Sequence, residues 1–429
     1  MNGKLPILLN VLFRTPAYFG LILLDRYLFR SGNPFLGIPR YIPELFTPPD
    51  RIFRLLREQN CIPPEARFVS IEHCGGADTE PDKNVARLEI VYSLPMSRQE
   101  KMQVFVKLPT AREWPAIAKA MITAIFPYAN EIAFHNEVLP WLARQAGGRE
   151  NLGFAVPNNL FATLSRPFYR AILIQECVDM GKYHSRADWM NADAGMVQRI
   201  IDSATDLHRR TWQLRNVPPN VLAQFQETSG VDWLDAGLAP LLLVAPASFR
   251  KMWKAIKKRT AGEPVTISHG DCRLGNCLFT SDFSEVLLTD WEVNSITYYL
   301  WDISYCMICS FTPEDRRKYE PEIIHRYLDA LKKNPANTGV PSFEGAMELH
   351  RISLIVINFF AGLIESFGGV GTKQGNSEND MKSWREKCEA AMADALEDEA
   401  VLAKILDVPV SLVRLFREDY IAYAQRQIG

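Results

Sequence analysis

Three polar side chains stand at a spacing that suits phosphoryl transfer. In the segment VTISHGDCRLGNCLFTSDFSEVLLTDWE, Asp271 is followed five residues later by Asn276, and Asp290 ends the apolar run VLLTD. Transfer of a phosphoryl group to a hydroxyl needs a carboxylate that orients the hydroxyl and accepts its proton, and oxygen ligands that hold magnesium on the nucleotide phosphates. Asp271 suits the first role, and Asn276 and Asp290 suit the second. The D-x-x-x-x-N spacing equals that of a kinase catalytic loop.

The same chemistry needs a cation on the phosphates, and a lysine lies at the end of a predicted strand upstream. The apolar run QVFVKLP contains Lys107, whose ammonium we expect to meet the phosphates. A helix carboxylate should hold this lysine. We choose Glu131 as that partner, and Glu137 is the alternative. A lysine at a strand end is ordinarily a solvated edge residue, but its place upstream of the Asp271 motif favours the functional interpretation.

A β-rich region should position the lysine. ARFVSIEH and NVARLEIVYS predict two antiparallel strands joined by a loop around residues 75–84, and KMQVFVKLP predicts a third strand. Residues 128–145 have helical periodicity, and FYRAILIQECV predicts a further strand. Asp50 is expected to cap the short helix RIFRLLREQN.

After Val178 the pattern becomes helical. ADAGMVQRIIDSATDLHRRTWQL and PEDRRKYEPEIIHRYLDALKK predict long helices, with short strands only around VTISHGD, NCLFT and EVLLTDWE. The tract 368–380 has no periodicity and is expected to be a loop. We therefore predict an α+β fold with a small β-rich N-lobe at 51–178, a large helical C-lobe at 179–429, a cleft between them and an N-terminal extension at 1–50.

Composition and charge exclude some classes. The chain has 429 residues, is 47% hydrophobic and carries a formal charge of -2, so it can bury a large core and lacks the basic excess of a nucleic-acid binder. Its eight cysteines are scattered, which favours a reduced, intracellular, cytoplasmic protein. Cys306 and Cys309 have C-x-x-C spacing, and with Cys272 and Cys277 they raise the alternative of a zinc site. Their apolar helical context, DISYCMICSF, favours small buried side chains instead.

The apolar segment 5–29 leaves two interpretations open. Arg14, Asp25 and Arg26 interrupt it, and its longest uncharged stretch is shorter than the roughly 20 residues that a membrane span needs. A signal peptide is not expected either. The segment is either an extension packed on the protein or an interfacial helix in peripheral contact with a membrane.

Together these motifs resemble the aminoglycoside phosphotransferase and choline kinase superfamily, and within it the ecdysteroid-kinase-like (CHK kinase-like) branch. SHGDCRLGNCLF is similar to the catalytic motif of that superfamily, LLTDWE to its metal-binding motif, LIQECV to its hinge, and TDLHRRTW to its Leu-His helix. The resemblance covers about residues 65–335. It implies a protein-kinase-like bilobal fold with ATP between the lobes.

The resemblance also implies roles for particular residues. Asp271 would be the catalytic base, and Asn276 and Asp290 would be Mg²⁺ ligands. Glu176 and Val178 would meet the adenine edge at the hinge. Asp302 would support the catalytic loop, although an aspartate there could equally be a helix N-cap. Lys107 and Glu131 fall at the phosphate-anchoring pair, His269 would brace the loop, and Glu292 is a candidate further metal contact.

Departures from the pattern leave the acceptor open. The chain has no G-x-G-x-x-G loop, no D-F-G glycine and no A-P-E segment, which disfavours a protein kinase. Cys177 occupies a hinge position that is often acidic in relatives. The resemblance favours a small-molecule alcohol, with a lipophilic, sterol-like acceptor as the first hypothesis. The alternatives are a choline or aminoglycoside type of amino alcohol, whose ammonium aromatic residues could cage, and a catalytically silent nucleotide-binding scaffold.

Overall fold

The computed structural model describes most of the chain, in two compact units. The described residues are 45–46, 48–74, 85–95, 98–108, 128–165, 170–185, 192–225, 238, 242, 245–366 and 378–428. The first unit comprises Met1–Glu150 and Val156–Tyr183, and the second comprises Asn151–Ala155 and His184–Gly429. The segment 5–29 and the predicted loop 75–84 lie outside the described residues, as does the tract 368–377.

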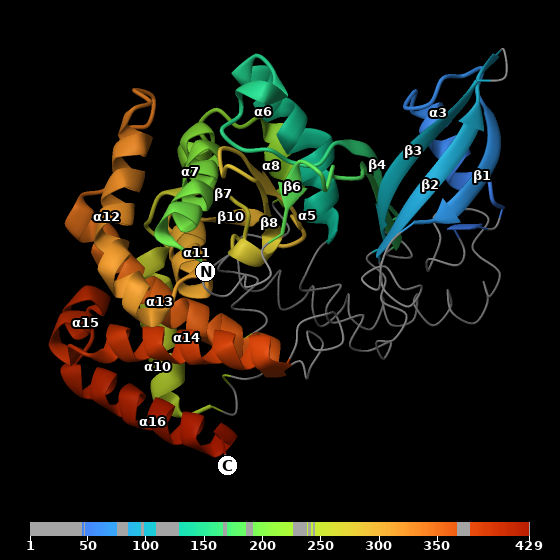
Figure 1. The fold of residues 1–429 in the computed structure, drawn as a ribbon. Helices are drawn as coiled ribbons and strands as arrows, with labels where there is room; N and C mark the ends of the chain where they lie inside the picture. Colours follow the sequence, from blue (N-terminus) through green and yellow to red (C-terminus); the bar gives the residue numbers. More distant parts are fainter. Residues whose placement is uncertain are drawn as a thin grey trace. The chain divides into compact units, whose positions relative to one another are not determined.

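An antiparallel five-stranded sheet forms the centre of the first unit (Figure 1). Its strands follow the order β1-β2-β3-β5-β4 and are β1 Arg67–His73, β2 Val85–Ser93, β3 Gln99–Lys107, β4 Asn159–Ser165 and β5 Arg170–Glu176. Strand β4 was not predicted from the sequence. An irregularity between Asn159 and Phe161 shifts its register, so its apolar residues do not alternate as a regular strand requires.

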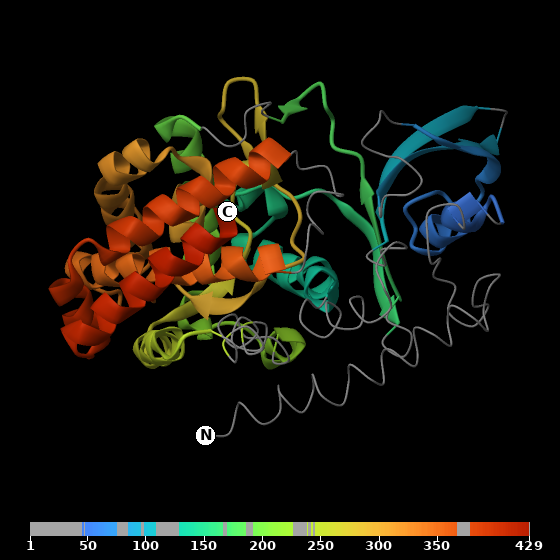
Figure 2. The same cartoon turned by 90° about the horizontal axis from the view of Figure 1, so that it is seen from below.

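Helix α3 (Arg51–Glu58) covers one face of this sheet, as Figure 2 shows. Its buried Ile52, Phe53 and Leu56 join the core formed by β2 and β3. Asp50 occupies the predicted N-cap position, but its side chain accepts no capping hydrogen bond. Asp50 instead pairs with Arg54 one turn later, at 3.2 Å.

The predicted helix at 128–145 contains an irregular turn. It consists of α5 (Tyr128–Ala133), a π-helical turn η5 (Phe134–Val138) and α6 (Leu139–Ala146), and it ends at Gly147 with φ of 75°. Pro140 lacks an amide hydrogen and its ring crowds the preceding turn, which explains the widening. The amide of Leu139 bonds the carbonyl of Phe134, five residues earlier.

The second unit is mainly helical (Figure 1). Its helices are α7 Ala194–Arg210, α8 Pro219–Phe225, α10 Ala247–Thr260, α11 Trp301–Ser310, α12 Pro313–Lys332, α13 Phe343–Ser366, α14 Glu378–Leu396, α15 Glu399–Leu406 and α16 Val410–Ile428. Every residue of α11 is buried, which places this helix at the centre of the unit. The tract 368–380 is not a loop throughout, because α14 begins at Glu378.

Short strands carry the predicted catalytic segment. They are β7 Val265–Ser268, β8 Cys277–Thr280, β9 Val286–Leu288 and β10 Ser295–Tyr298, and the short strand β6 (Tyr183–His184) precedes them in the sequence. β7 pairs with β10 and β8 pairs with β9, both antiparallel. Sequence analysis missed β6 and β10, each of which is four residues or shorter.

The predicted α+β class is confirmed, with a β-rich first unit and a helical second unit. No helix in the described part of the chain has the length and apolar character needed to cross a bilayer. All eight cysteines are free thiols. No group of three or more potential ligands among the described residues brings cysteines together around a metal position, which disfavours the zinc alternative.

Candidate active site

The segment Ser268–Asn276 leaves β7 and forms a tight loop that ends in the 3-10 turn η8 (Leu274–Asn276). Gly270 has a φ of +87°, and a Cβ atom there would lie 2.1 Å from the carbonyl oxygen of Val293. Only glycine fits such a left-handed, closely approached position. Gly270 therefore allows the tight turn that positions the next residue, Asp271.

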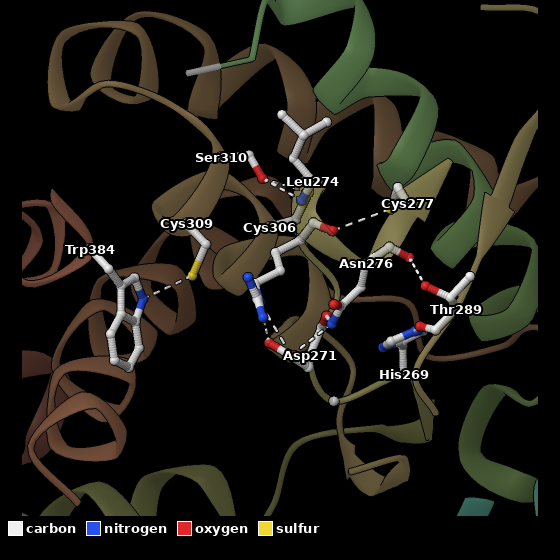
Figure 3. A network of polar contacts seen from close by, with 12 residues as sticks. His269, Asp271, Leu274, Asn276, Cys277, Thr289, Cys306, Cys309, Ser310 and Trp384 are labelled. Atoms are coloured by element: carbon white, nitrogen blue, oxygen red, sulfur yellow. Dashed lines mark hydrogen bonds and ion pairs between the residues drawn. The ribbon is translucent and has the colours of Figure 1, made fainter. Parts of the chain in front are cut away.

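The carboxylate of Asp271 is held by two neighbours on the same loop (Figure 3). The Nε of Arg273 lies 3.0 Å from Oδ1 and 3.2 Å from Oδ2, and the amide Nδ2 of Asn276 donates to Oδ2 at 2.7 Å. Burial alone would lower the pKa of Arg273, but the negative charge of Asp271 outweighs burial and raises it. Sequence analysis missed Arg273, although its position two residues after Asp271 was a usable signal.

Asn276 connects this loop to the strand that precedes Asp290. Its Nδ2 also donates to the carbonyl of Asp271 at 2.9 Å, which leaves its Oδ1 facing away from that residue as a potential ligand. Its own carbonyl accepts both the amide and the hydroxyl of Thr289, at 2.9 and 3.0 Å. The structure therefore brings Asp271, Asn276 and the Thr289–Asp290 turn into one network.

Asp290 has a backbone conformation that aspartate adopts rarely. Its φ is +61°, in the left-handed region, and such residues cost free energy and gather at functional sites. One carboxylate oxygen of Asp290 lies within 4.8 Å of one of Glu292. Two carboxylates this close to each other offer hard oxygen donors that suit a divalent cation.

A buried aspartate on α11 fixes the backbone on the other side of the loop. Oδ2 of Asp302 accepts the amide of His269 at 2.7 Å, and Oδ1 accepts the amide of Gly270 at 2.9 Å. Helix α11 begins at Trp301, so Asp302 is not its N-cap. The side chain of Trp301 adds a bond from Nε1 to the carbonyl of Gly270 at 2.9 Å. Sequence analysis named Asp302 but missed Trp301.

The ring of His269 braces the loop. Its Nε2 lies 2.9 Å from the carbonyl of Thr289, so Nε2 is the donor. Its Nδ1 is buried without a hydrogen-bond partner among the described residues, and the ring packs on Trp291 with centroids 4.4 Å apart. The ring is directed toward the turn that precedes Asp290, in keeping with a structural role.

In the first unit, Lys107 and Glu131 form a buried ion pair. Nζ of Lys107 lies 3.0 Å from Oε2 of Glu131, with only 13% and 5% of the side chains exposed. Glu131 on α5, rather than Glu137 in the π turn, is therefore the partner of Lys107. The π turn itself is anchored by Asn136, whose amide donates to the carbonyl of Ala162 on β4 at 3.0 Å.

A histidine in the π turn faces the strand that leads to the hinge. Nε2 of His135 accepts from the amide of Gln175 on β5 at 3.2 Å. Burial, with the charges of Arg149 and Lys107, lowers the pKa of His135 to about 3, so the ring is neutral. A neutral ring adds no positive charge beside Lys107.

The predicted hinge follows β5. The amide of Glu176 bonds the carbonyl of Asn158 at 2.9 Å, and the amide of Cys177 bonds the carbonyl of Gln103 at 3.2 Å. Among the described residues no hydrogen-bond partner is recorded for the amide of Val178. The Glu176 side chain accepts from Nδ2 of Asn158 at 2.7 Å. The hinge strand is thus fixed in place up to Cys177, and the N–H of Val178 forms no hydrogen bond within the described part of the chain.

Comparison with known proteins supports the resemblance found in the sequence. Residues 242–339 match the family model described as the Ecdysteroid kinase-like family, which confirms that resemblance over the catalytic segment. This match contains Asp271, Asn276 and Asp290. No curated protein sequence matches the chain.

Several solved structures are similar to this chain. An amicoumacin kinase, hAmiN, in complex with AMP-PNP, Ca²⁺ and Ami is 11% identical, with 79% of this chain and 93% of that chain covered and a TM-score of 0.44. A choline/ethanolamine kinase family protein from Mesorhizobium loti is 14% identical, with 85% and 99% covered and a TM-score of 0.43. The choline kinase LicA from Streptococcus pneumoniae is 15% identical, with 80% and 99% covered and a TM-score of 0.41. At these values the likenesses assign no role to any residue of this chain.

Proposed function

We propose that the protein transfers the γ-phosphate of ATP to a hydroxyl group of a small molecule. The observation that carries this proposal is the position of Asn276, which bonds the carboxylate of Asp271 through its side chain and the Thr289–Asp290 turn through its carbonyl. A proton acceptor and two oxygen ligands in one rigid network are the parts that phosphoryl transfer requires. The match of this segment to an ecdysteroid kinase-like family supports the same conclusion.

In this proposal the first unit binds the nucleotide. The ammonium of Lys107, held by Glu131, contacts the phosphates. The backbone of Glu176 and Val178 meets the adenine edge, and the available amide of Val178 supports that assignment. His135, which is neutral, adds no positive charge of its own to those of Lys107 and Arg149.

The second unit supplies the groups for magnesium. Asn276 Oδ1 and the carboxylates of Asp290 and Glu292 are hard oxygen donors, and the 4.8 Å limit on the separation of the two carboxylates is compatible with a shared divalent ion. When bound, the ion neutralises the charge of the phosphate oxygens. The backbone of Asp290 is strained, as is typical of functional sites where the direction of a side chain matters more than the local stability of the backbone.

Asp271 performs the proton step. The acceptor hydroxyl donates its hydrogen bond to the carboxylate, its oxygen forms the new bond to the γ-phosphorus, and the bond from that phosphorus to the bridging oxygen of ADP breaks. The proton passes to Asp271. Because Arg273 and Asn276 already donate to the carboxylate, we infer that it mainly orients the hydroxyl, which suits a transition state that needs positioning more than strong base catalysis.

We propose a lipophilic, sterol-like alcohol as the acceptor. Five described aromatic residues of the second unit are candidates for a cage around an ammonium group, and all five are core residues: Trp212, Trp291 and Trp301 are at most 6% exposed, and Tyr298 and Tyr299 are buried. They therefore do not form an open cage for an ammonium group. Trp189 and Trp233 lie outside the described residues. The description of the matching family also favours this acceptor class.

The test compares phosphate transfer from labelled ATP, with and without Mg²⁺, by the wild type and by Asp271→Asn. We expect the variant to lose about 100-fold or more of the activity, the usual contribution of a positioned acid–base group. Asp329→Asn changes an exposed aspartate on α12 in the same way and should retain full activity. Equal activity of wild type and Asp271→Asn would refute the enzymatic proposal.

The acceptor class is tested separately with a mixed extract of metabolites. Labelled product that partitions into the organic phase would support the lipophilic acceptor. Product that stays in the aqueous phase would reject it in favour of an amino alcohol. Nucleotide binding without transfer to any acceptor would indicate a silent scaffold.

A further inference from the structure

A chain of buried polar groups continues from Asp302 into the helical core. Oδ2 of Asp302 lies 3.2 Å from Nε2 of His208 on α7, and Nδ1 of His208 lies 2.9 Å from the hydroxyl of Tyr327 on α12. The hydroxyl of Tyr327 lies 2.7 Å from the carbonyl oxygen of Tyr299. All four side chains are buried, and His208 and Asp302 have no measurable exposure.

The donors and acceptors in this series of hydrogen bonds determine which atoms carry the protons. A carbonyl oxygen can only accept, so the single hydroxyl proton of Tyr327 belongs to the bond with Tyr299. Tyr327 must therefore accept from His208, which places a proton on Nδ1. At the other nitrogen, the carboxylate of Asp302 is also an acceptor, which places a second proton on Nε2.

The ionisation state of Asp302 supports the presence of two protons on the ring of His208. Burial alone would raise the pKa of Asp302, but the hydrogen bond and the charge of His208 lower it, with smaller contributions from His269 and Ser268. Asp302 is thus ionised while it accepts the amides of His269 and Gly270. A buried carboxylate needs a compensating charge, and His208 is the group in contact with it that can supply one.

We propose that His208 is a positively charged positioning residue, a buried imidazolium that keeps Asp302 ionised so that Asp302 can hold the backbone of the loop carrying Asp271. The protonation state follows from the hydrogen bonds of His208 together with the ionised state of Asp302. The effect on the loop rests on the proposed phosphotransferase activity, since it concerns the placement of Asp271.

A second buried histidine of the same unit provides a matched comparison. His350 on α13 lies 3.1 Å from the carboxylate of Glu320 and 2.9 Å from the hydroxyl of Ser304. The Ser304 hydroxyl, unlike that of Tyr327, has no recorded carbonyl acceptor among the described residues, so it can donate to the ring. His350 thus shares the burial and the carboxylate partner of His208 but contacts neither Asp302 nor the loop.

The test of the protonation state is nitrogen NMR on the full chain with ¹⁵N-labelled histidine. Seven histidines contribute signals. His208→Gln identifies the signals of His208, and Tyr327→Phe, which shifts them by removing the acceptor of Nδ1, identifies them if the first variant does not fold. At pH 7.5 we expect both ring nitrogens of His208 to resonate in the range of protonated nitrogens. A signal in the unprotonated range for either nitrogen overturns the proposal.

The test of the role in positioning is steady-state kinetics on the same variants. We expect His208→Gln and Tyr327→Phe to lower kcat by about 10- to 100-fold, as for a small displacement of a catalytic group, with the KM for ATP changed by less than about twofold. His350→Gln should retain kcat within about twofold. A change in KM alone, or an equal loss of kcat in His350→Gln, overturns the positioning role.

The two proposals fail in different ways. If the wild type transfers no phosphate to any acceptor, the proposed function fails, while the NMR spectrum still decides the state of His208. If the wild type is active and His208 has one unprotonated nitrogen, only the present inference fails.

Discussion

Thr289 donates both its amide and its hydroxyl hydrogen to a single acceptor, the carbonyl oxygen of Asn276, at 2.9 and 3.0 Å. Asn276 is itself a proposed metal ligand. Thr289 directly precedes a second proposed ligand, Asp290. The two bonds fix the separation of two chain segments that lie 13 residues apart in sequence. The distance between the proposed ligands thus depends on a threonine that is not itself a proposed ligand.

Replacing this hydroxyl should weaken the metal site. Thr289→Val removes one of the two bonds and keeps the shape of the side chain. Because residues that orient ligands typically contribute 10- to 100-fold in metal affinity, we expect the apparent Mg²⁺ affinity to fall by about tenfold. A titration of activity against Mg²⁺ measures this. Thr280→Val is the control, because its hydroxyl bonds Asp282 instead, and equal behaviour of both variants would contradict the prediction.

The ion pair of the first unit should matter for nucleotide use. Lys107→Met removes the phosphate contact, and Glu131→Gln removes the carboxylate that holds Lys107 at 3.0 Å. We expect each to lower kcat/KM for ATP by roughly 10- to 100-fold, because both act on the phosphates. Glu137→Gln changes the half-buried glutamate of the π turn and should have little effect. If Glu137→Gln is the more damaging substitution, the assignment of the pair is wrong.

Gly270 should not tolerate even a methyl group. Gly270→Ala forces a side chain into a backbone with φ of +87° and against the carbonyl of Val293. The strained backbone alone costs about 1–3 kcal/mol, and relief of the clash must displace the loop that carries Asp271. Chemical unfolding and turnover assays should both show a loss. Gly262→Ala adds a methyl group where no atom lies within 4 Å, and it should change neither measurement.

A buried charge network between helices should make stability depend on pH. Glu320 on α12 contacts His350 at 3.1 Å and Arg316 at 2.8 Å. Burial would raise the pKa of Glu320, but these two partners lower it below its ordinary 4.5. A lowered pKa in the folded state gives stability that is complete above pH 4.5 and is lost as the pH falls through the folded-state pKa.

Glu320→Gln should therefore destabilise the protein by about 3 kcal/mol near neutral pH, the lower end for a broken buried pair, because Arg316 keeps its contact with Asp394. The difference from wild type should shrink as the pH falls below 4.5. Urea unfolding at several pH values measures it. The exposed Glu322→Gln should show no such trend, and a difference that grows in acid would contradict the assignment.

Local sequence patterns predicted much of the fold and of the site. Apolar residues alternate in β2 and β3 and recur with the helical period in α7 and α12, because each element buries one side. The fold class could therefore be predicted from the sequence. Asp271, Asn276 and Asp290 were found because their spacing within one segment reflects a single chemistry. Strand β4 was missed because its register shift removes the alternation on which prediction depends.

The supporting residues of the site are harder to predict because they come from distant segments. Tyr327 on α12 is 119 residues from His208, and no local pattern connects them. Trp301 looks like an ordinary core aromatic until its Nε1 is seen to bond Gly270. Arg273 and Thr289 are different, since each lies within two residues of a predicted site residue and could have been considered.

The π turn at Phe134–Val138 sets the phase between the two halves of its helix. Each residue of an α-helix turns the chain by about 100°, so the one extra residue in that turn rotates everything before it relative to everything after it. Deleting a residue there would produce a more regular helix, yet Asn136 and His135 could then keep their strand contacts only if Glu131 turned away from Lys107. The ion pair between Lys107 on β3 and Glu131 on α5 therefore depends partly on the number of residues in the π turn. Deleting one residue from that turn should be more damaging than most substitutions of its side chains.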